Sequence, residues 1–129
     1  MLKKRVLIVE DEVSLLKLET ILLTVKGYEV SGASTGNDAL EKLSGEVFDL
    51  ILLDIMLPDI DGYEICRRIK ENPRHTGTPV VMLTARKSTG DQERGAICGA
   101  DAYLTKPFKS AMIIEVMERL LPAVSRVEK

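Results

Sequence analysis

The sequence predicts an α/β fold: a doubly wound, flavodoxin-like parallel sheet of five strands with five helices, (βα)5. The first observation is that short apolar runs of strand length alternate along the chain with segments of helical periodicity. The second is that these runs are apolar nearly throughout, as in parallel strands covered on both faces and joined by helical crossovers. The runs are Val6 to Val9, Tyr28 to Ala33, Phe48 to Leu53, Val80 to Leu83 and Ala102 to Thr105.

The helices are placed by their terminators and by the spacing of apolar residues. The first should begin at Asp11 as N-cap and stop at Lys26-Gly27, where glycine can adopt the left-handed conformation that ends a helix. The next three are expected at Gly36 to Leu43, Gly62 to Glu71 and about Ser88 to Cys98. The last contains Ile113, Val116, Met117 and Leu120, which recur at helical spacing.

The composition bounds the class of protein. The 129 residues fit one domain, expected at residues 1–122, with 123–129 as a tail or the start of a linker. A net charge of −2, with no basic patch, predicts no binding to nucleic acid. Cys66 and Cys98 belong to no CxxC motif, and no apolar run is long enough to span a membrane, so we expect a reducing, cytoplasmic setting. His75 lies in a polar loop and is expected at the surface.

Polar side chains follow the predicted strands at their carboxyl ends. Glu10 and Asp11 follow the first strand, and Asp54 follows the third. Thr84 ends the fourth strand, and Lys106 follows the fifth. Any one of these carboxylates could be an ordinary helix cap or turn residue. Because the carboxyl ends of parallel strands meet at one edge of the sheet, their joint occurrence indicates a functional site.

The chemistry of this cluster favours phosphoryl transfer. Three neighbouring carboxylates repel one another, and Mg²⁺, which prefers oxygen ligands, would relieve that repulsion. Asp54 directly follows the buried run Leu50 to Leu53, which fixes its backbone, so its carboxylate is a positioned nucleophile that could attack phosphorus. The Thr84 hydroxyl and the Lys106 ammonium group would offset the developing charge.

From Lys4 to about Leu121 the sequence resembles the receiver domain of bacterial two-component response regulators. The matching motifs are Val6 to Glu12, Asp54 to Pro58, Asp61-Gly62, Leu83 to Ala85 and Gly99 to Phe108. The resemblance implies a phosphoprotein of phosphorelay signal transduction, with Asp54 as phosphoacceptor. A histidine kinase or phosphotransfer protein would be the donor. The surface of the fourth helix, fifth strand and fifth helix would control an output domain or protein.

The resemblance also implies a role for each site residue. Asp11 would bind Mg²⁺ directly, Glu10 through water, and the Met56 backbone carbonyl would complete the metal site together with Asp54. The implied protein is a signalling domain rather than an enzyme with a separate substrate.

Three further roles concern the phosphorylated state. Thr84 would hydrogen-bond the phosphoryl group and Lys106 would pair with it. Tyr103 would turn inward as Thr84 moves. The Lys106–Pro107 peptide bond is usually cis in the family.

Three positions depart from the family pattern, and the output stays open. Glu10 replaces the more usual Asp. Met112 and Val116 stand where regulators with winged-helix outputs carry Glu and Arg, which argues against that subfamily.

The glycine-rich segment Ser88 to Gly99 should form a weak helix that shifts on phosphorylation. Dimerisation on phosphorylation is left open.

Three alternative functions compete with this interpretation. A haloacid-dehalogenase-type phosphatase needs a second Asp two positions after its nucleophile, where this chain has Met56. A nucleotide or flavin binder lacks its glycine-rich motif here, and the chain has no Trp. A degenerate receiver that serves only for docking would not need to retain the four site residues Asp11, Asp54, Thr84 and Lys106.

Overall fold

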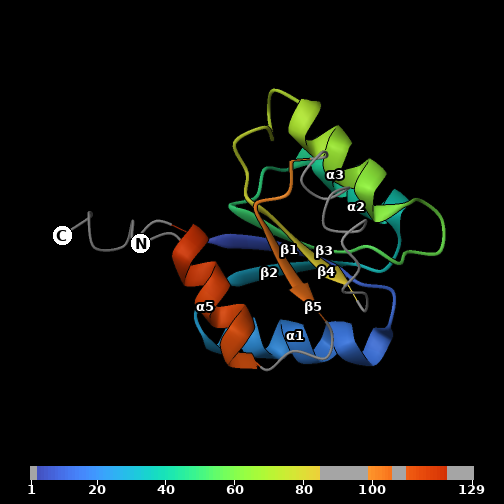
Figure 1. Cartoon of the computed structure of the whole chain (residues 1–129). Coiled ribbons are helices and arrows are strands. Elements are labelled where there is room, and N and C mark those ends of the chain that lie inside the picture. The colour runs from blue at the N-terminus through green and yellow to red at the C-terminus, as the bar shows by residue number, and fades with distance from the viewer. Residues whose placement is uncertain (1–2, 85–98, 106–109, 122–129) are drawn as a thin grey trace.

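The computed structural model describes residues 3–84, 99–105 and 110–121, which form a parallel sheet between two layers of helices (Figure 1). The elements are β1 (Arg5–Val9), α1 (Val13–Val25), β2 (Glu29–Ala33), α2 (Gly36–Gly45), β3 (Leu50–Asp54), α3 (Gly62–Glu71), β4 (Val80–Thr84), β5 (Ala102–Thr105) and α5 (Ser110–Leu120). The helix predicted near Ser88 to Cys98 falls outside the described residues, as does the proposed tail after Leu121.

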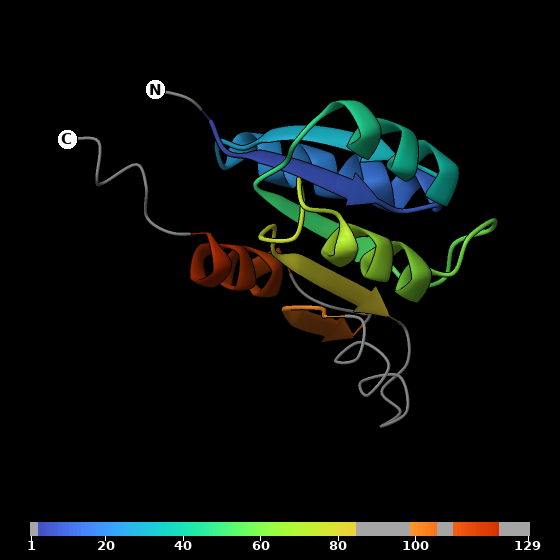
Figure 2. The same ribbon diagram turned by 90° about the horizontal axis from the view of Figure 1, so that it is seen from above.

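The strand order is β2-β1-β3-β4-β5, and all four pairings are parallel. The strands point the same way in Figure 2, so their carboxyl ends lie at one edge. This order confirms the flavodoxin-like prediction. The chain reverses its direction of winding at β1, which places β2 on one side and β3 on the other. Ligands bind at such a switch point in doubly wound folds.

Two separate cores lie on opposite faces of the sheet. Because successive strand side chains point to opposite faces, Ile51 and Leu53 of β3 enter one core while Leu50 and Leu52 enter the other. The first core is closed by α2 and α3, and the second by α1 and α5. The prediction of strands covered on both faces is therefore confirmed for β1 and β3. It is wrong for β2, whose edge position leaves Glu29 and Gly32 exposed.

The helix boundaries agree with the sequence prediction except at two ends. Helix α3 has the predicted bounds, and Gly27 has the expected left-handed backbone, with φ of 101°. Helix α2 runs two residues further than predicted, to Gly45. The N-cap of α1 is Glu12 rather than Asp11, and its side chain makes no capping hydrogen bond. The Asp11 carboxylate instead joins the other acidic residues at the strand ends.

Helix α5 shows that one of its two unusual positions belongs to the core. Val116 is 7% exposed and packs with Ile113 and Met117 in the second core. Its identity therefore follows from packing and says little about a surface. Met112 is 41% exposed and does lie on the outside of the helix.

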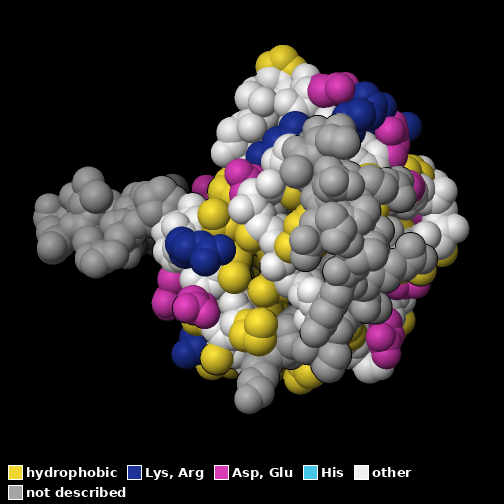
Figure 3. Space-filling model, in the orientation of Figure 1, with side chains coloured by type: hydrophobic (Ala, Val, Ile, Leu, Met, Phe, Trp, Pro, Cys, Tyr) yellow, Lys and Arg dark blue, Asp and Glu magenta, His cyan; other side chains and the backbone are white. Residues whose placement is uncertain are grey.

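The α3 helix carries an ion-pair network on its exposed side, and charged side chains of both signs gather there in Figure 3. Hydrogen bonds from Arg67 and Arg68 lower the pKa of Glu64 to about 2. Because these groups are exposed, solvent screens the pairs and their contribution to stability is small. No helix among the described residues is both long enough and apolar enough to cross a membrane.

The prediction that His75 lies at the surface is wrong. Its side chain is 1% exposed, and Nε2 donates to the Leu43 carbonyl oxygen at 2.8 Å. The neighbouring Arg74 guanidinium donates to the Ser44 carbonyl oxygen at 3.0 Å. Both carbonyls lie in the last turn of α2, where helix carbonyls have no intrahelical partner. The loop after α3 therefore folds over and caps the carboxyl end of α2.

This burial predicts that His75→Ala destabilises the protein. The variant loses a buried ring and the hydrogen bond to Leu43, so the free energy of unfolding should fall by about 2–4 kcal/mol. Arg74→Ala is the matched control, because it removes an exposed side chain from the same cap and should cost no more than about 1 kcal/mol. Urea unfolding measures both. Equal small losses would contradict the burial.

Candidate functional site

Three carboxylates meet at the carboxyl ends of β1 and β3. Glu10, Asp11 and Asp54 each place one carboxylate oxygen within 4.8 Å of the other two. Glu10 and Asp54 are buried, whereas Asp11 is exposed. The cluster thus has a sheltered base and one side that solvent can reach. This convergence confirms the prediction for these three residues, each of which follows a predicted strand in the sequence.

The Glu10 carboxylate is held by the backbone around it. The Glu10 N–H extends the β1–β2 pairing by donating to the Ala33 carbonyl oxygen at 2.9 Å. Its Oε2 accepts from the Glu12 N–H at 3.2 Å, at the point where α1 begins. This hydrogen bond ties the Glu10 carboxylate to the start of α1, and Asp11 lies between Glu10 and Glu12, the two residues that it joins.

Asp54 is the last residue of the central strand β3. Its position is fixed by pairing with Leu83 of β4, and the following residue, Ile55, donates to the Leu83 carbonyl oxygen at 3.0 Å. The Asp54 Oδ1 accepts from the Met56 N–H at 3.1 Å. At 3% exposure Asp54 is sheltered from solvent. In such surroundings a neighbouring positive charge acts on the carboxylate more strongly than it would in water.

Gly62, at the start of α3, lies directly against this strand end. A Cβ atom there would come within 2.7 Å of both the Asp54 carbonyl oxygen and the Ile55 Cα. The Gly62 N–H donates to the Ile55 carbonyl oxygen at 3.2 Å. Asp61 caps the same helix by accepting from the Tyr63 N–H at 2.8 Å. The helix can approach Asp54 this closely only because residue 62 has no side chain.

The remaining predicted site residues are described in part. Thr84 ends β4 in register with Thr105, the last residue of β5. Lys106 and Pro107 lie outside the described residues, although Lys106 directly follows Thr105. The Met56 side chain is exposed, and its backbone N–H faces Asp54.

Tyr103 of β5 is half-buried against the first core, and its hydroxyl donates to the Tyr63 hydroxyl at 3.1 Å. Sequence reasoning did not anticipate this partner on α3. The two residues are far apart in the chain, and no local pattern links them. The spacing of Tyr63 on the buried face of α3 could have placed it in the core, but not against Tyr103.

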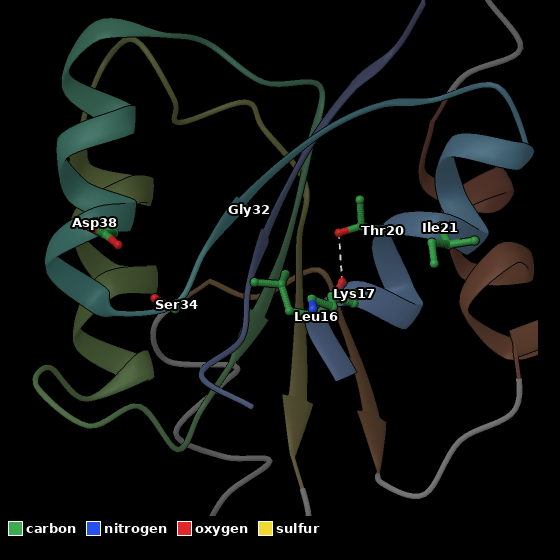
Figure 4. A pocket seen from close by; sticks show the side chains of 7 residues that line it. All are labelled: Leu16, Lys17, Thr20, Ile21, Gly32, Ser34 and Asp38. Atoms are coloured by element: carbon green, nitrogen blue, oxygen red, sulfur yellow. Dashed lines mark hydrogen bonds between the residues drawn. The ribbon is translucent and has the colours of Figure 1, made fainter. Parts of the chain in front are cut away.

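A cavity of about 440 Å³ opens elsewhere, at the edge of the sheet (Figure 4). It lies between α1, β2 and the start of α2, and its lining residues are Leu16, Lys17, Thr20, Ile21, Gly32, Ser34 and Asp38. Thr20 is occupied by a hydrogen bond to the Leu16 carbonyl oxygen. None of the three clustered carboxylates lines this cavity, so it is separate from the acidic cluster.

The donor set of the cluster fits a hard divalent cation. Carboxylate oxygens are the ligands that Mg²⁺ and Ca²⁺ prefer, and Mg²⁺ characteristically uses one or two of them together with waters. A cation would also offset the mutual repulsion of three neighbouring negative charges. The open side of the cluster at Asp11 leaves access for such an ion and for an anionic group that would bind to it.

Comparison with protein families agrees with this geometry. A family model described as the response regulator receiver domain matches residues 6–118. The transcriptional regulatory protein TrcR of Mycobacterium tuberculosis is 41% identical over 125 residues, which cover 97% of this chain and 48% of that protein. The chain spans about half the length of the curated relatives it matches.

Solved structures show the same fold. A CheY-like response regulator receiver domain protein from Methanospirillum hungatei matches with a TM-score of 0.86 and 34% identity, covering 92% of this chain and 94% of that one. The receiver domain of the sensor histidine kinase PA1611 from Pseudomonas aeruginosa matches with a TM-score of 0.85 and 31% identity, covering 93% and 98%. Its structure has a magnesium ion coordinated in the active-site cleft.

The close approach at Gly62 predicts that Gly62→Ala displaces the end of β3. The added methyl group would meet backbone atoms, so we expect a loss of about 1–3 kcal/mol in the free energy of unfolding. The amide NMR shifts of Ile55 and Met56 should also change. Gly45→Ala is the control, because nothing lies within 4 Å of a Cβ there and its backbone angle is ordinary. An unshifted Met56 amide in Gly62→Ala would contradict the prediction.

Proposed function

Because the chain belongs to the response regulator receiver domain family, we propose that it accepts a phosphoryl group on Asp54 and signals through the charge it gains. The convergence of Glu10, Asp11 and Asp54 at the ends of β1 and β3 is the observation that carries this proposal. Of the three, Asp54 has the nucleophile's position, since its backbone is fixed within the central strand.

The proposed donor is a phosphohistidine on a histidine kinase or phosphotransfer protein. One Asp54 carboxylate oxygen attacks phosphorus, and an O–P bond forms as the donor's N–P bond breaks. The electron pair of the broken bond leaves with the imidazole nitrogen. The product is an acyl phosphate, which carries about −1.5 to −2 charges. The domain assists this transfer and the later hydrolysis but turns over no separate substrate, so its role is that of a signalling switch.

We assign the metal to Mg²⁺, held by Asp11, Asp54 and the Met56 carbonyl, with Glu10 acting through water. When bound, this ion supplies positive charge that neutralises the carboxylates and the phosphoryl oxygens. The clustering of the three carboxylates supports the assignment, as does the magnesium ion coordinated in the PA1611 receiver domain. Meanwhile, the Met56 N–H orients the Asp54 carboxylate through its contact with Oδ1.

The roles of Thr84, Lys106 and Tyr103 are proposed from the family motif. Thr84 would hydrogen-bond the phosphoryl group and Lys106 would pair with its charge, with a cis bond between Lys106 and Pro107. Tyr103 would respond to the movement of Thr84. The Tyr103 side chain is already half-buried beside Tyr63 in this structure, whereas the family motif implies that it turns inward as Thr84 moves.

The proposed output is a separate domain or protein controlled through the surface of β5, α5 and the helix predicted near Ser88 to Cys98. TrcR is named a transcriptional regulatory protein at 41% identity, which weakens the argument against DNA-binding outputs drawn from Met112 and Val116. The burial of Val116 weakens it further. We propose no nucleic-acid or membrane contact by this domain itself and a cytoplasmic location, and we leave a phosphorylation-dependent homodimer open.

Acetyl phosphate with Mg²⁺ tests the phosphoacceptor. Intact-mass spectrometry should show a gain of one phosphoryl group in the wild type and none in Asp54→Asn, because a neutral amide lacks the negatively charged oxygen that attacks phosphorus. Asp49→Asn is the matched control: Asp49 lies just before the opposite end of β3, where it accepts from the Arg5 N–H at 2.7 Å, and the variant should still be phosphorylated. Modification of Asp54→Asn to the wild-type extent would overturn the assignment.

The metal assignment predicts that Asp11→Asn weakens Mg²⁺ binding by about tenfold or more, since it removes a charged ligand. Phosphorylation should become slow at low Mg²⁺ and recover in part as Mg²⁺ is raised. Chelation by EDTA should abolish phosphorylation of the wild type. Mg²⁺ titrations followed by amide NMR shifts give the dissociation constants. A wild-type dissociation constant in Asp11→Asn would exclude Asp11 as a ligand.

A further inference from the structure

The loop that follows the phosphoacceptor is tied to a neighbouring helix by one carboxylate. Asp59 lies in the loop between β3 and α3, and its two oxygens reach the amino end of α2. Oδ1 accepts from the Gly36 N–H at 2.8 Å, and Oδ2 accepts from the Asn37 N–H at 2.9 Å. Oδ1 also accepts from the Ile60 N–H at 3.0 Å within the loop. Both oxygens of the carboxylate are therefore used.

These bonds complete a helix start that its own cap leaves unfinished. Thr35 supplies its side-chain oxygen to the Asp38 N–H at 3.0 Å and its carbonyl oxygen to the Ala39 N–H at 3.1 Å. The two remaining free donors of the first turn, Gly36 and Asn37, are the ones that Asp59 accepts from. A negative charge is also favoured at a helix amino end. Hydrogen bonds from Asn37 and Gly36 accordingly hold the pKa of Asp59 below its ordinary value.

The helix start also fits closely against the loop. A Cβ atom on Gly36 would come within 2.9 Å of the Ile60 Cβ and the Ile65 Cδ1. Glycine at residue 36 thus lets the backbone of α2 reach the Asp59 carboxylate. The contact is a fitted junction rather than a chance pairing of exposed groups.

The same loop is also bonded to the end of the phosphoacceptor strand β3, at residues on both sides of Asp59. The Met56 N–H donates to the Asp54 Oδ1, and the Leu57 and Gly62 N–H groups both donate to the Ile55 carbonyl oxygen. The loop therefore has one attachment at the end of β3 and a second at α2. The Met56–Leu57 peptide contains the Met56 carbonyl group and belongs to the first attachment, because its N–H donates to the Ile55 carbonyl oxygen. It lies two residues before Asp59, which makes the second attachment.

We propose that Asp59 is a positioning residue for the phosphoacceptor site: by fastening the loop to α2, it fixes the Met56 peptide relative to Asp54. The inference rests on the proposed function, because the Met56 carbonyl is there a Mg²⁺ ligand. A loop released from α2 would sample other conformations, and the metal site would lose part of its preorganisation. Groups that orient metal ligands typically contribute about 10–100-fold to metal affinity.

Asp59→Asn in the full chain tests this, because the amide keeps one acceptor oxygen and turns a donor toward one of the two N–H groups. The dissociation constant for Mg²⁺, measured by amide NMR shifts, should rise about tenfold. The phosphorylation rate with acetyl phosphate should fall at low Mg²⁺ and return close to the wild-type rate at saturating Mg²⁺. The Met56 and Leu57 amide signals should shift even without Mg²⁺. Asp59→Ala, which removes all three hydrogen bonds, should show at least the same loss.

Thr35→Ala is the matched control, because it removes a hydrogen bond from the same helix end without touching the loop. It should destabilise α2 while leaving the Mg²⁺ dissociation constant close to that of the wild type. If both Asp59 variants bind Mg²⁺ as Thr35→Ala does, Asp59 only caps the helix and the inference is overturned. If the wild type itself neither binds Mg²⁺ nor becomes phosphorylated, the proposed function fails and takes the inference with it.

Discussion

Mutual repulsion among the Glu10, Asp11 and Asp54 carboxylates is the constraint around which this domain is organised. Holding three like charges within 4.8 Å opposes folding, so other interactions of the folded state must offset this repulsion. The sheet supplies these interactions, because β1 and β3 are buried on both faces and paired in a fixed register. Moving Asp54 away from Glu10 would require breaking the central pairing of the sheet.

The segments that follow the strands fix the position of the acidic cluster further. Gly62 allows α3 to start against the Asp54 carbonyl oxygen. The Ile55 carbonyl oxygen accepts hydrogen bonds from the N–H groups of Leu57 and Gly62. Helix α2 is held at its amino end by Asp59 and at its carboxyl end by His75 and Arg74. The segments on either side of α3 thus hold α2 in place, and α2 in turn supports the loop beside the acidic cluster.

The sequence predicted most of this framework, because parallel strands and their ends leave a local signature. The alternation of apolar runs and helical segments predicted a doubly wound parallel sheet, and α3 has the predicted bounds of Gly62 and Glu71. What it could not give depends on contacts between distant residues. The residues around His75 are typical of an exposed loop, and only the fold brings its ring to the Leu43 carbonyl oxygen. Asp59 looks like an ordinary turn residue, since its partners lie more than twenty positions earlier.

The two cores on either face of the sheet have a consequence for β5. Tyr103 packs with the α2–α3 layer, while its neighbour Leu104 packs with the α1–α5 layer. Adjacent residues of one edge strand therefore address opposite sides of the molecule. Any change in the position of this strand would therefore alter side-chain packing on both faces of the sheet at once.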